Sequence, residues 1–379
     1  MIKLTSHFEC GNGKNIQQIA GNHFRMEVDG DLLEGYCVYF CFDVVNEADA
    51  TTVTIELHED PKFGAPTGFS LCFPTTIWIR PTGLDHYRPL PDQPALNDGH
   101  IVMKVPVAAH QSVRVALTYV APYSEISELL RQMAQTRSDR CSAFVLGRSS
   151  EQREIHGLRV GTPGCPKVLV VAGQHSHEHA GVWGVFGIAD FLSSLIPEAA
   201  ALRERLDIQI VPIVNPDGNV LGRNAFNAEG LEMYCAFGDN PAAPEPEAVE
   251  NRILWDWAVS ENPVLWMNFH AYTGWKANSE FPYDGWYEVA DRSAFADDPK
   301  RLLYDALCDT VRLQTDALST HAQPGIHPES SLCHQLAKRH QVPTVFYELN
   351  NGTAGRHAAT QRALRVFRMT AQTILHDVS

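Results

Sequence analysis

The chain lacks the hydrophobic segments that are typical of membrane and secreted proteins. Its 379 residues contain no apolar run of about 18 residues, the length that a membrane-spanning helix needs. The first nine residues contain no apolar core of a signal peptide. Internal repeats and low-complexity segments are absent as well, and the composition excludes an intrinsically disordered or collagen-like chain. We therefore expect a cytoplasmic protein without a membrane partner.

Basic residues are scarce relative to acidic ones. The chain has 30 Lys and Arg residues against 45 Asp and Glu residues, which gives a formal net charge of −15. Because an acidic surface repels phosphate backbones and anionic lipids, we expect no nucleic-acid partner. The nine cysteines are odd in number and include no CxxC pair. This usage predicts reduced, mostly buried thiols rather than a disulfide framework or a thiolate metal site.

The first part of the chain is rich in short β-type segments separated by Gly, Pro and Asp turns. Many short strands with such turns favour an antiparallel sandwich. We therefore predict an N-terminal antiparallel β-sandwich domain over residues 1–122. The candidate strands are residues 36–42, 52–57, 76–80, 100–107 and 112–120.

After residue 122, compact apolar runs alternate with amphipathic helical segments. This alternation predicts an α/β domain over residues 123–379, with a mixed, largely parallel sheet flanked by helices. Ser124 is a candidate N-cap for the first helix. The candidate strands are residues 167–172, 208–214, 264–269 and 344–347, and the candidate helices are residues 124–135, 182–195, 245–259 and 300–318.

Three of these apolar runs end in side chains that can bind a metal or move protons. His175 and Glu178 follow the first run, His270 ends another, and Glu348 ends the last. Two His and one Glu around zinc leave an open position for water, as catalytic sites require. Each residue alone is more typical of a polar loop, a hydrogen-bonded core position or a solvated strand end, and only the order of strands and ligands favours the metal site. His177, beside the metal loop, is expected to support the ligands.

Five motifs along the chain resemble motifs of the zinc carboxypeptidase family, and specifically of its cytosolic-carboxypeptidase-like branch. They are residues 8–12 (FECGN), 121–124 (APYS), 145–149 (VLGRS), 155–161 (IHGLRVG) and 215–218 (NPDG). The resemblance covers nearly the whole chain and implies a carboxypeptidase-like fold with a Zn²⁺ cofactor. It implies that His175, Glu178 and His270 are the metal ligands and that Glu348 is the catalytic general acid/base.

The chain departs from the family pattern where the substrate is bound. After the NPDG turn, that pattern has an arginine that polarises the scissile carbonyl, and then an Asn-Arg pair that binds the terminal carboxylate. Aligned on Gly222 and Gly230, this chain has Ala225 at the first of these positions. Tyr234 and Cys235 stand at the Asn-Arg pair. Neither side chain offers the two-bond clamp of a guanidinium, so recognition of a free C-terminus is not expected in the usual manner.

Other side chains are candidates for contact with the substrate. We predict that Arg223 has a catalytic role at the oxyanion and also binds substrate. Asn224, Tyr234 and Arg356 are predicted substrate-binding residues, and Lys276 is a further cation on a rim loop. A structural or surface role is the alternative for each of them.

The sequence thus predicts a zinc-dependent hydrolase of the carboxypeptidase type that cleaves an amide bond in a peptide or peptide-like substrate. Zinc would activate a water molecule, and Glu348 would accept its proton and pass it to the leaving amine. One alternative is an N-acyl amino acid deacylase, amidase or esterase on the same fold, acting on a small acylated amino acid. Another is a catalytically inactive binding protein, which retention of all three ligands and Glu348 disfavours. A homo-oligomer is compatible with the sequence.

Overall fold

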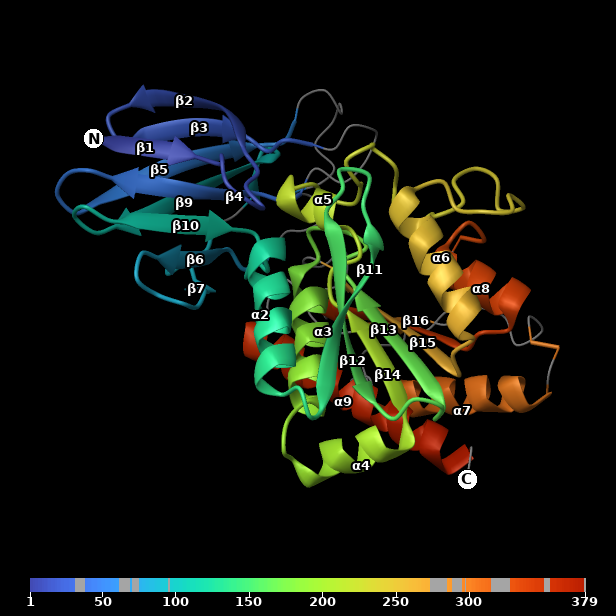
Figure 1. Ribbon diagram of the computed structural model, residues 1–379. Coiled ribbons are helices and arrows are strands. Elements are labelled where there is room, and N and C mark those ends of the chain that lie inside the picture. Colours follow the sequence, from blue (N-terminus) through green and yellow to red (C-terminus); the bar gives the residue numbers. More distant parts are fainter. Residues whose placement is uncertain are drawn as a thin grey trace.

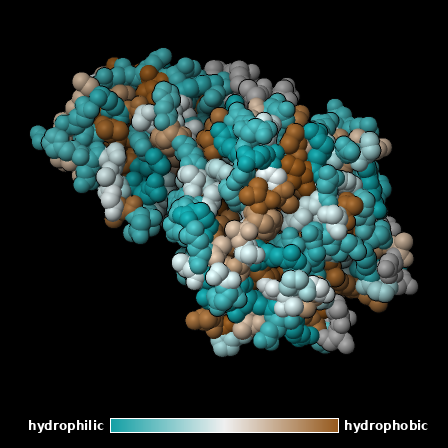
Figure 2. All heavy atoms as spheres, in the orientation of Figure 1, coloured by the Kyte–Doolittle hydropathy of each residue, from teal (hydrophilic) through white to brown (hydrophobic). Residues whose placement is uncertain are grey.

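The computed structural model describes ten stretches of the chain, arranged as a β-rich N-terminal part beside a larger α/β part (Figure 1). The described residues are 1–30, 38–60, 69, 75–94, 96–272, 285–287, 295–296, 298–314, 328–350 and 355–377. On the face shown in Figure 2, hydrophilic residues predominate and hydrophobic residues are scattered among them. Among the described helices, none is long and apolar enough to cross a membrane alone. The helices α3 (His179–Leu192) and α4 (Pro197–Arg205) together have the length and composition of a membrane span, although the chain bends by 92° between them.

The described N-terminal strands form two five-stranded sheets, in the orders β1-β4-β10-β6-β7 and β2-β3-β5-β9-β8. Alternate residues of β5 and β9 are buried, and they pack with apolar residues of the other sheet in one core. The strands are β1 (Ile2–Thr5), β2 (Lys14–Ala20), β3 (His23–Glu27), β4 (Cys41–Asn46), β5 (Thr51–His58), β6 (Trp78–Pro81), β7 (Arg88–Pro89), β8 (Leu96–Asn97), β9 (His100–Val107) and β10 (Ser112–Ala116). The predicted sandwich is confirmed, with the correction that β3 and β5 pair in parallel.

The α/β part is built on a seven-stranded sheet of the order β11-β12-β14-β13-β15-β17-β16. Its four central strands are parallel, and the pairs at both edges are antiparallel. The predicted mixed, largely parallel sheet is therefore confirmed. The strands are β11 (Cys141–Arg148), β12 (Glu154–Gly161), β13 (Lys167–Ala172), β14 (Asp207–Val211), β15 (Leu265–Tyr272), β16 (Gly285–Tyr287) and β17 (Thr344–Asn350).

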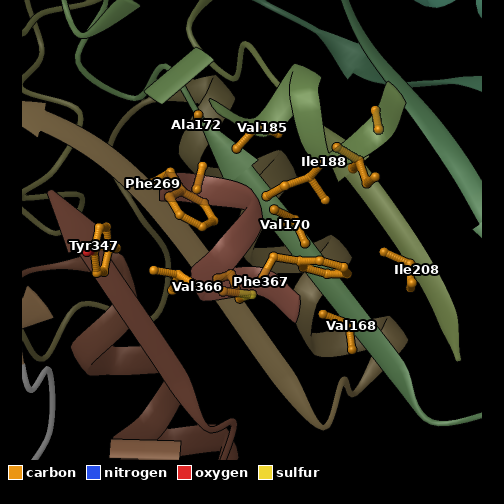
Figure 3. Packing of buried hydrophobic residues seen from close by; sticks show 14 of the residues in the cluster. Val168, Val170, Ala172, Val185, Ile188, Ile208, Phe269, Tyr347, Val366 and Phe367 are labelled. Carbon is orange, nitrogen blue, oxygen red and sulfur yellow. The ribbon is translucent and has the colours of Figure 1, made fainter. Parts of the chain in front are cut away.

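Helices cover both faces of this sheet, because its central strands are apolar on both sides. In β13, Val168 and Val170 pack in the core with α3 and α9, as Figure 3 shows, whereas Leu169 and Val171 pack in the core with α6 and α8. The helices are α2 (Tyr123–Thr136), α3 (His179–Leu192), α4 (Pro197–Arg205), α5 (Pro216–Val220), α6 (Val249–Glu261), α7 (Asp298–Gln314), α8 (Leu332–His340) and α9 (Arg356–Asp377).

Some local expectations are wrong. Ser124 lies inside α2 rather than at its N-cap, which is Pro122, and the backbone and side chain of Ser124 donate hydrogen bonds to Glu9. The helix expected over 245–259 begins only at Val249. β15 and β17 continue beyond their apolar runs, so His270 and Glu348 lie within strands and not at strand ends.

Candidate metal centre and active site

His175 and Glu178 lie in the short connection between β13 and α3. Gly173 turns the chain there with a φ of +68°, a left-handed conformation that favours glycine. Glu178 is the N-cap residue of α3, and its backbone N–H donates a hydrogen bond to the carbonyl oxygen of His175. This connection lies at the carboxyl end of a parallel strand, where ligands bind in open α/β sheets.

His270 and Glu348 are neighbours on adjacent parallel strands. They are paired in the register of β15 and β17. Side chains two residues apart along a strand share one face of the sheet. His270 and Glu348 therefore lie on the same face as Trp266 and Phe346, which belong to the core with α6 and α8.

The imidazoles of His175 and His270 converge on the carboxylate of Glu178. Nδ1 of His175 lies 2.8 Å from Oε1 of Glu178, and Nδ1 of His270 lies 2.8 Å from Oε2. One ligand atom from each of the three residues falls within 4.8 Å of the others. Glu178 and His270 are buried, with exposed fractions of 5% and 0%. The structure therefore brings together the three residues that the sequence nominated as metal ligands.

The other nitrogen of each imidazole contacts an acceptor. Nε2 of His175 lies 2.8 Å from Oε1 of Glu232, and Nε2 of His270 lies 3.2 Å from Oε1 of Gln174. Glu232 also accepts hydrogen bonds from the backbone N–H groups of Tyr234 and Cys235. The sequence analysis missed Glu232 and Gln174.

This arrangement perturbs the pKa values of the four central groups. Burial would raise the pKa of Glu178, but the two imidazoles outweigh it and hold that pKa well below its usual range. Burial would lower the pKa of His175, whereas Glu178 and Glu232 raise it well above normal. Burial lowers the pKa of His270 despite the adjacent Glu178. Burial, with the charge of Glu178, raises the pKa of Glu348 well above its usual value.

The donor set fits zinc. Two imidazole nitrogens and one carboxylate are common ligands of catalytic zinc. Within the described residues, Nδ1 of His270 is buried and makes no hydrogen bond of acceptable geometry, although it lies close to Glu178. With its Nε2 facing the amide oxygen of Gln174, this imidazole turns Nδ1 toward Glu178, so Nδ1 is the atom that can bind a metal.

The NPDG turn anchors the loops behind the metal centre. Asn215 caps α5 by accepting a hydrogen bond from the backbone N–H of Gly218, and its Nδ2 donates to the carbonyl oxygen of Gln174. A Cβ at Gly218 would lie 2.6 Å from the carbonyl oxygen of Phe226, so glycine is required there by close approach. Asp217 is fully buried and accepts hydrogen bonds from residues 149–153.

Residues 222–224 lie between the N-terminal sheets and the metal loop. Oδ1 of Asn224 accepts hydrogen bonds from the backbone N–H groups of Val38 and Tyr39, at 3.1 and 2.8 Å. The carbonyl oxygen of Arg223 accepts a hydrogen bond from Oγ of Ser176, and Nε of Arg223 is buried without a partner in the described part of the chain. A substrate contact by Asn224 or Arg223 stays a prediction.

The two further histidines of the metal loop are engaged elsewhere. Nδ1 of His177 lies 2.7 Å from the carbonyl oxygen of Asn224. His179 is fully buried, accepts a hydrogen bond from the backbone N–H of Ala121 and contacts the hydroxyl of Tyr39. Burial lowers the pKa of His179 to about 3, so this imidazole is neutral at physiological pH. His177 thus joins the loop to Asn224, and His179 joins it to the N-terminal part; a role of His177 in supporting the ligands stays a prediction.

Tyr234 forms an aromatic wall beside the metal centre. Its ring centroid lies 6.0 Å from that of His175, 5.5 Å from that of His270 and 5.3 Å from that of Phe346. Burial, and then the nearby Glu232, raise the pKa of Cys235 to about 11, so its thiol stays neutral. An aromatic ring and a neutral thiol thus occupy the two positions of the Asn-Arg pair.

Arg356 lies apart from the metal centre, against the ring of Trp183. Its guanidinium carbon is 3.3 Å from the centroid of the Trp183 ring, and it lines a surface pocket of about 530 Å³ between β6, α3 and α9. Its predicted contact with substrate stays a prediction. Lys276 lies outside the described residues.

A sequence model of the zinc carboxypeptidase family matches residues 126–342, which is more than half of the chain. The chain belongs to the zinc carboxypeptidase family. The predicted family is therefore confirmed, and with it the zinc cofactor that this family uses.

Among curated proteins, the chain is similar to members of the predicted branch. It is 25% identical to cytosolic carboxypeptidase 2 of Danio rerio over 61% of this chain and 35% of that protein. It is 26% identical to cytosolic carboxypeptidase 6 of Mus musculus over 60% of this chain and 44% of that protein. The matches thus span less than half the length of these relatives.

Solved structures of bacterial enzymes share the whole fold. The metallo-carboxypeptidase of Burkholderia cenocepacia covers 100% of this chain and 99% of its own, with a TM-score of 0.80 and 17% identity. That of Pseudomonas aeruginosa, in complex with (2-guanidinoethylmercapto)succinic acid, covers 99% of each chain with a TM-score of 0.77 and 18% identity. At these identities the likeness shows the fold, which includes the N-terminal sheets.

Proposed function

We propose that this chain is a zinc-dependent hydrolase of amide bonds in peptides or peptide-like compounds. The observation that carries the proposal is the convergence of His175, Glu178 and His270 within 4.8 Å, with Glu348 in register beside His270. Membership of the zinc carboxypeptidase family supports it. The three convergent residues are the proposed zinc ligands.

Zinc, when bound, supplies a Lewis acid that lowers the pKa of water toward neutrality. Glu348 is the proposed general base and acid, which accepts a proton from the attacking water and returns it to the leaving nitrogen. Its Oε2 makes no hydrogen bond within the described residues, so this oxygen is available for a proton. Burial raises the pKa of Glu348, which strengthens its affinity for that proton.

The proposed substrate does not depend on a C-terminal carboxylate held in the usual family manner. Cys235 has no charge to offer, and Tyr234 presents its ring to both imidazoles. Phe346 stacks on His270 with a centroid distance of 4.4 Å. This aromatic surface suits an apolar or aromatic group next to the scissile bond. The same observation favours the second candidate, a deacylase of N-acyl amino acids.

Two further parts of the proposal concern organisation and location. We propose an N-terminal domain over residues 1–122 and a catalytic domain over 123–379, because β10 ends at Ala116 and α2 begins at Tyr123. Similarity to cytosolic carboxypeptidases 2 and 6 supports a cytoplasmic location.

Metal analysis tests the ligand assignment. The purified protein should contain about one zinc per chain, and His175→Ala and His270→Ala should each lose most of it. His156→Ala is the control, because His156 stacks on Tyr123 and belongs to β12. Full zinc occupancy in both variants would refute the assignment of His175 and His270 as zinc ligands.

A substrate panel tests the reaction and separates the two candidates. It would contain unblocked peptides, their C-terminal amides, N-acyl amino acids and matched esters. We expect hydrolysis of amides that is indifferent to C-terminal amidation, or a preference for acyl compounds, which would identify the deacylase. If the protein releases single C-terminal residues from unblocked peptides and C-terminal amidation abolishes this release, the substrate proposal is contradicted. No hydrolysis by the zinc-loaded protein would favour a binding protein.

A further inference from the structure

The side-chain amide of Gln174 contacts His270 and also the backbone next to Glu232, the residue that contacts His175. Its side chain is 1% exposed. Nε2 of Gln174 lies 2.6 Å from the carbonyl oxygen of Met233 and 3.3 Å from Oδ1 of Asn251. Its Oε1 lies 3.0 Å from Nδ2 of Asn268 and 3.2 Å from Nε2 of His270. All four polar contacts of this amide are therefore made inside the protein.

These contacts fix which end of the amide faces His270. A backbone carbonyl can only accept, so the group 2.6 Å from the oxygen of Met233 must be the NH₂ of Gln174. The oxygen of Gln174 then faces Nε2 of His270, and that nitrogen must carry the hydrogen. Nδ1 of His270 is then the nitrogen that faces Glu178, at 2.8 Å, and it is the atom placed to bind a metal.

The same amide reaches the second imidazole through the backbone. Met233 follows Glu232, whose carboxylate contacts Nε2 of His175. The carbonyl oxygen of Met233 accepts hydrogen bonds from Gln174 and from Nδ2 of Asn251. Gln174 thus contacts one imidazole directly and fixes the segment that carries the acceptor for the other.

We propose that Gln174 is a positioning residue of the metal centre, which sets the tautomer of His270 and the placement of Glu232. The inference rests on the proposed zinc ligands. Hydrogen-bond partners behind metal ligands typically contribute about 10–100-fold to metal affinity. Gln174→Leu keeps the approximate volume and removes both the donor and the acceptor.

The test is zinc affinity of the full chain, measured by competition with a chelator at fixed pH. Gln174→Leu should raise the zinc dissociation constant about 10–100-fold. Gln209→Leu is the matched control, because Gln209 is 5% exposed on β14 and bonds Trp257. The control should change the constant less than about threefold, because Gln209 contacts neither imidazole nor the segment that carries Glu232. A dissociation constant of Gln174→Leu within threefold of the wild type would overturn the proposal.

A conservative variant separates positioning from packing. Gln174→Glu keeps an acceptor for Nε2 of His270 but turns an oxygen toward the carbonyl of Met233. It should therefore bind zinc more tightly than Gln174→Leu, even though that repulsion lowers its stability. If zinc affinity instead follows stability across the three Gln variants, Gln174 acts only in packing.

A measurement without a variant tests the tautomer directly. In nitrogen-15 NMR spectra of the zinc-loaded wild type, His270 should carry its hydrogen on Nε2. A hydrogen on Nδ1 of His270 in the zinc-loaded protein would overturn the proposal. Absence of zinc binding by the wild type would instead contradict the proposed function, so the two failures are distinguishable.

Discussion

Replacement of Glu348 by glutamine separates the chemistry of this carboxylate from its place in the structure. Gln has nearly the same shape as Glu, and Oε2 of Glu348 has no hydrogen bond to lose within the described residues. We therefore expect Glu348→Gln to fold and to bind zinc. Turnover of an amide substrate should fall about 10²–10⁴-fold, because the amide cannot accept the proton from water. This loss corresponds to about 3–5 kcal/mol of transition-state stabilisation.

The same variant should stabilise the metal-free protein in a pH-dependent way. Burial raises the pKa of Glu348 above its ordinary value of 4.5, so the folded state binds this proton more tightly than the unfolded state. Wild-type stability should then fall as the pH rises from about 4.5 toward the folded-state pKa. Each unit of raised pKa corresponds to about 1.4 kcal/mol. Glu348→Gln cannot titrate and should escape this loss.

The two expectations are checked together. Turnover is measured with confirmed zinc content, and urea unfolding of chelator-treated protein is measured across this pH range. Glu329→Gln is the control, because Glu329 is exposed and should change neither quantity. Near wild-type turnover would place the general base elsewhere. A stability gain that is absent, or that shrinks as the pH rises, would refute the account of the buried carboxylate.

Substitutions at three further residues test other contacts. Glu232→Ala should weaken zinc binding about 10–100-fold in chelator competition and Glu232→Gln less, because the amide oxygen still accepts from His175. Asp217→Asn should lower the free energy of unfolding by about 3 kcal/mol in urea, whereas Glu151→Gln, on an exposed ion pair, should cost under about 0.5 kcal/mol. Asn224→Ala should lower the free energy of unfolding by about 2 kcal/mol, because it leaves two buried N–H groups unsatisfied. Unchanged zinc affinity of Glu232→Ala, or unchanged stability of Asp217→Asn or Asn224→Ala, would contradict the corresponding contact.

The site residues that lie on strands, His270 and Glu348, could be predicted from the sequence. β13 and β9 match their expected bounds, because compact apolar runs with β-branched residues are strong local signals. His270 and Glu348 were recognised next to such runs. The period of two then places both on one face, and the parallel register makes them neighbours.

The supports of that centre could not be predicted, because they depend on tertiary contacts. Glu232 contacts an imidazole 57 residues away in the sequence, and Gln174 contacts one 96 residues away. Ser124 shows the same limit in a helix: it has the composition of an N-cap, but its side chain bonds Glu9, which lies 115 residues earlier. Local patterns carry no information about such partners.

Residues 230–235 combine support of the metal centre with the proposed surface for the substrate, and the two roles fall on different atoms. Glu232 accepts from His175, and the backbone carbonyl of Met233 is fixed by Gln174. The hydrogen bonds from Tyr234 and Cys235 to Glu232 come from backbone N–H groups, which any side chain except proline preserves.

It follows that the side chains at 234 and 235 can change without loss of the metal centre. The double variant Tyr234→Asn/Cys235→Arg should keep the zinc dissociation constant within about threefold of the wild type, because it leaves the hydrogen-bond partners of both imidazoles in place. It should also increase kcat/KM for unblocked peptides over their C-terminal amides, because a guanidinium can clamp a carboxylate with two bonds. Tyr234→Phe, which keeps the ring and adds no charge, is the control and should leave this ratio unchanged. If the double variant loses zinc, the two roles are not separable, and if it binds zinc without a change in preference, the substrate's carboxylate does not reach these positions.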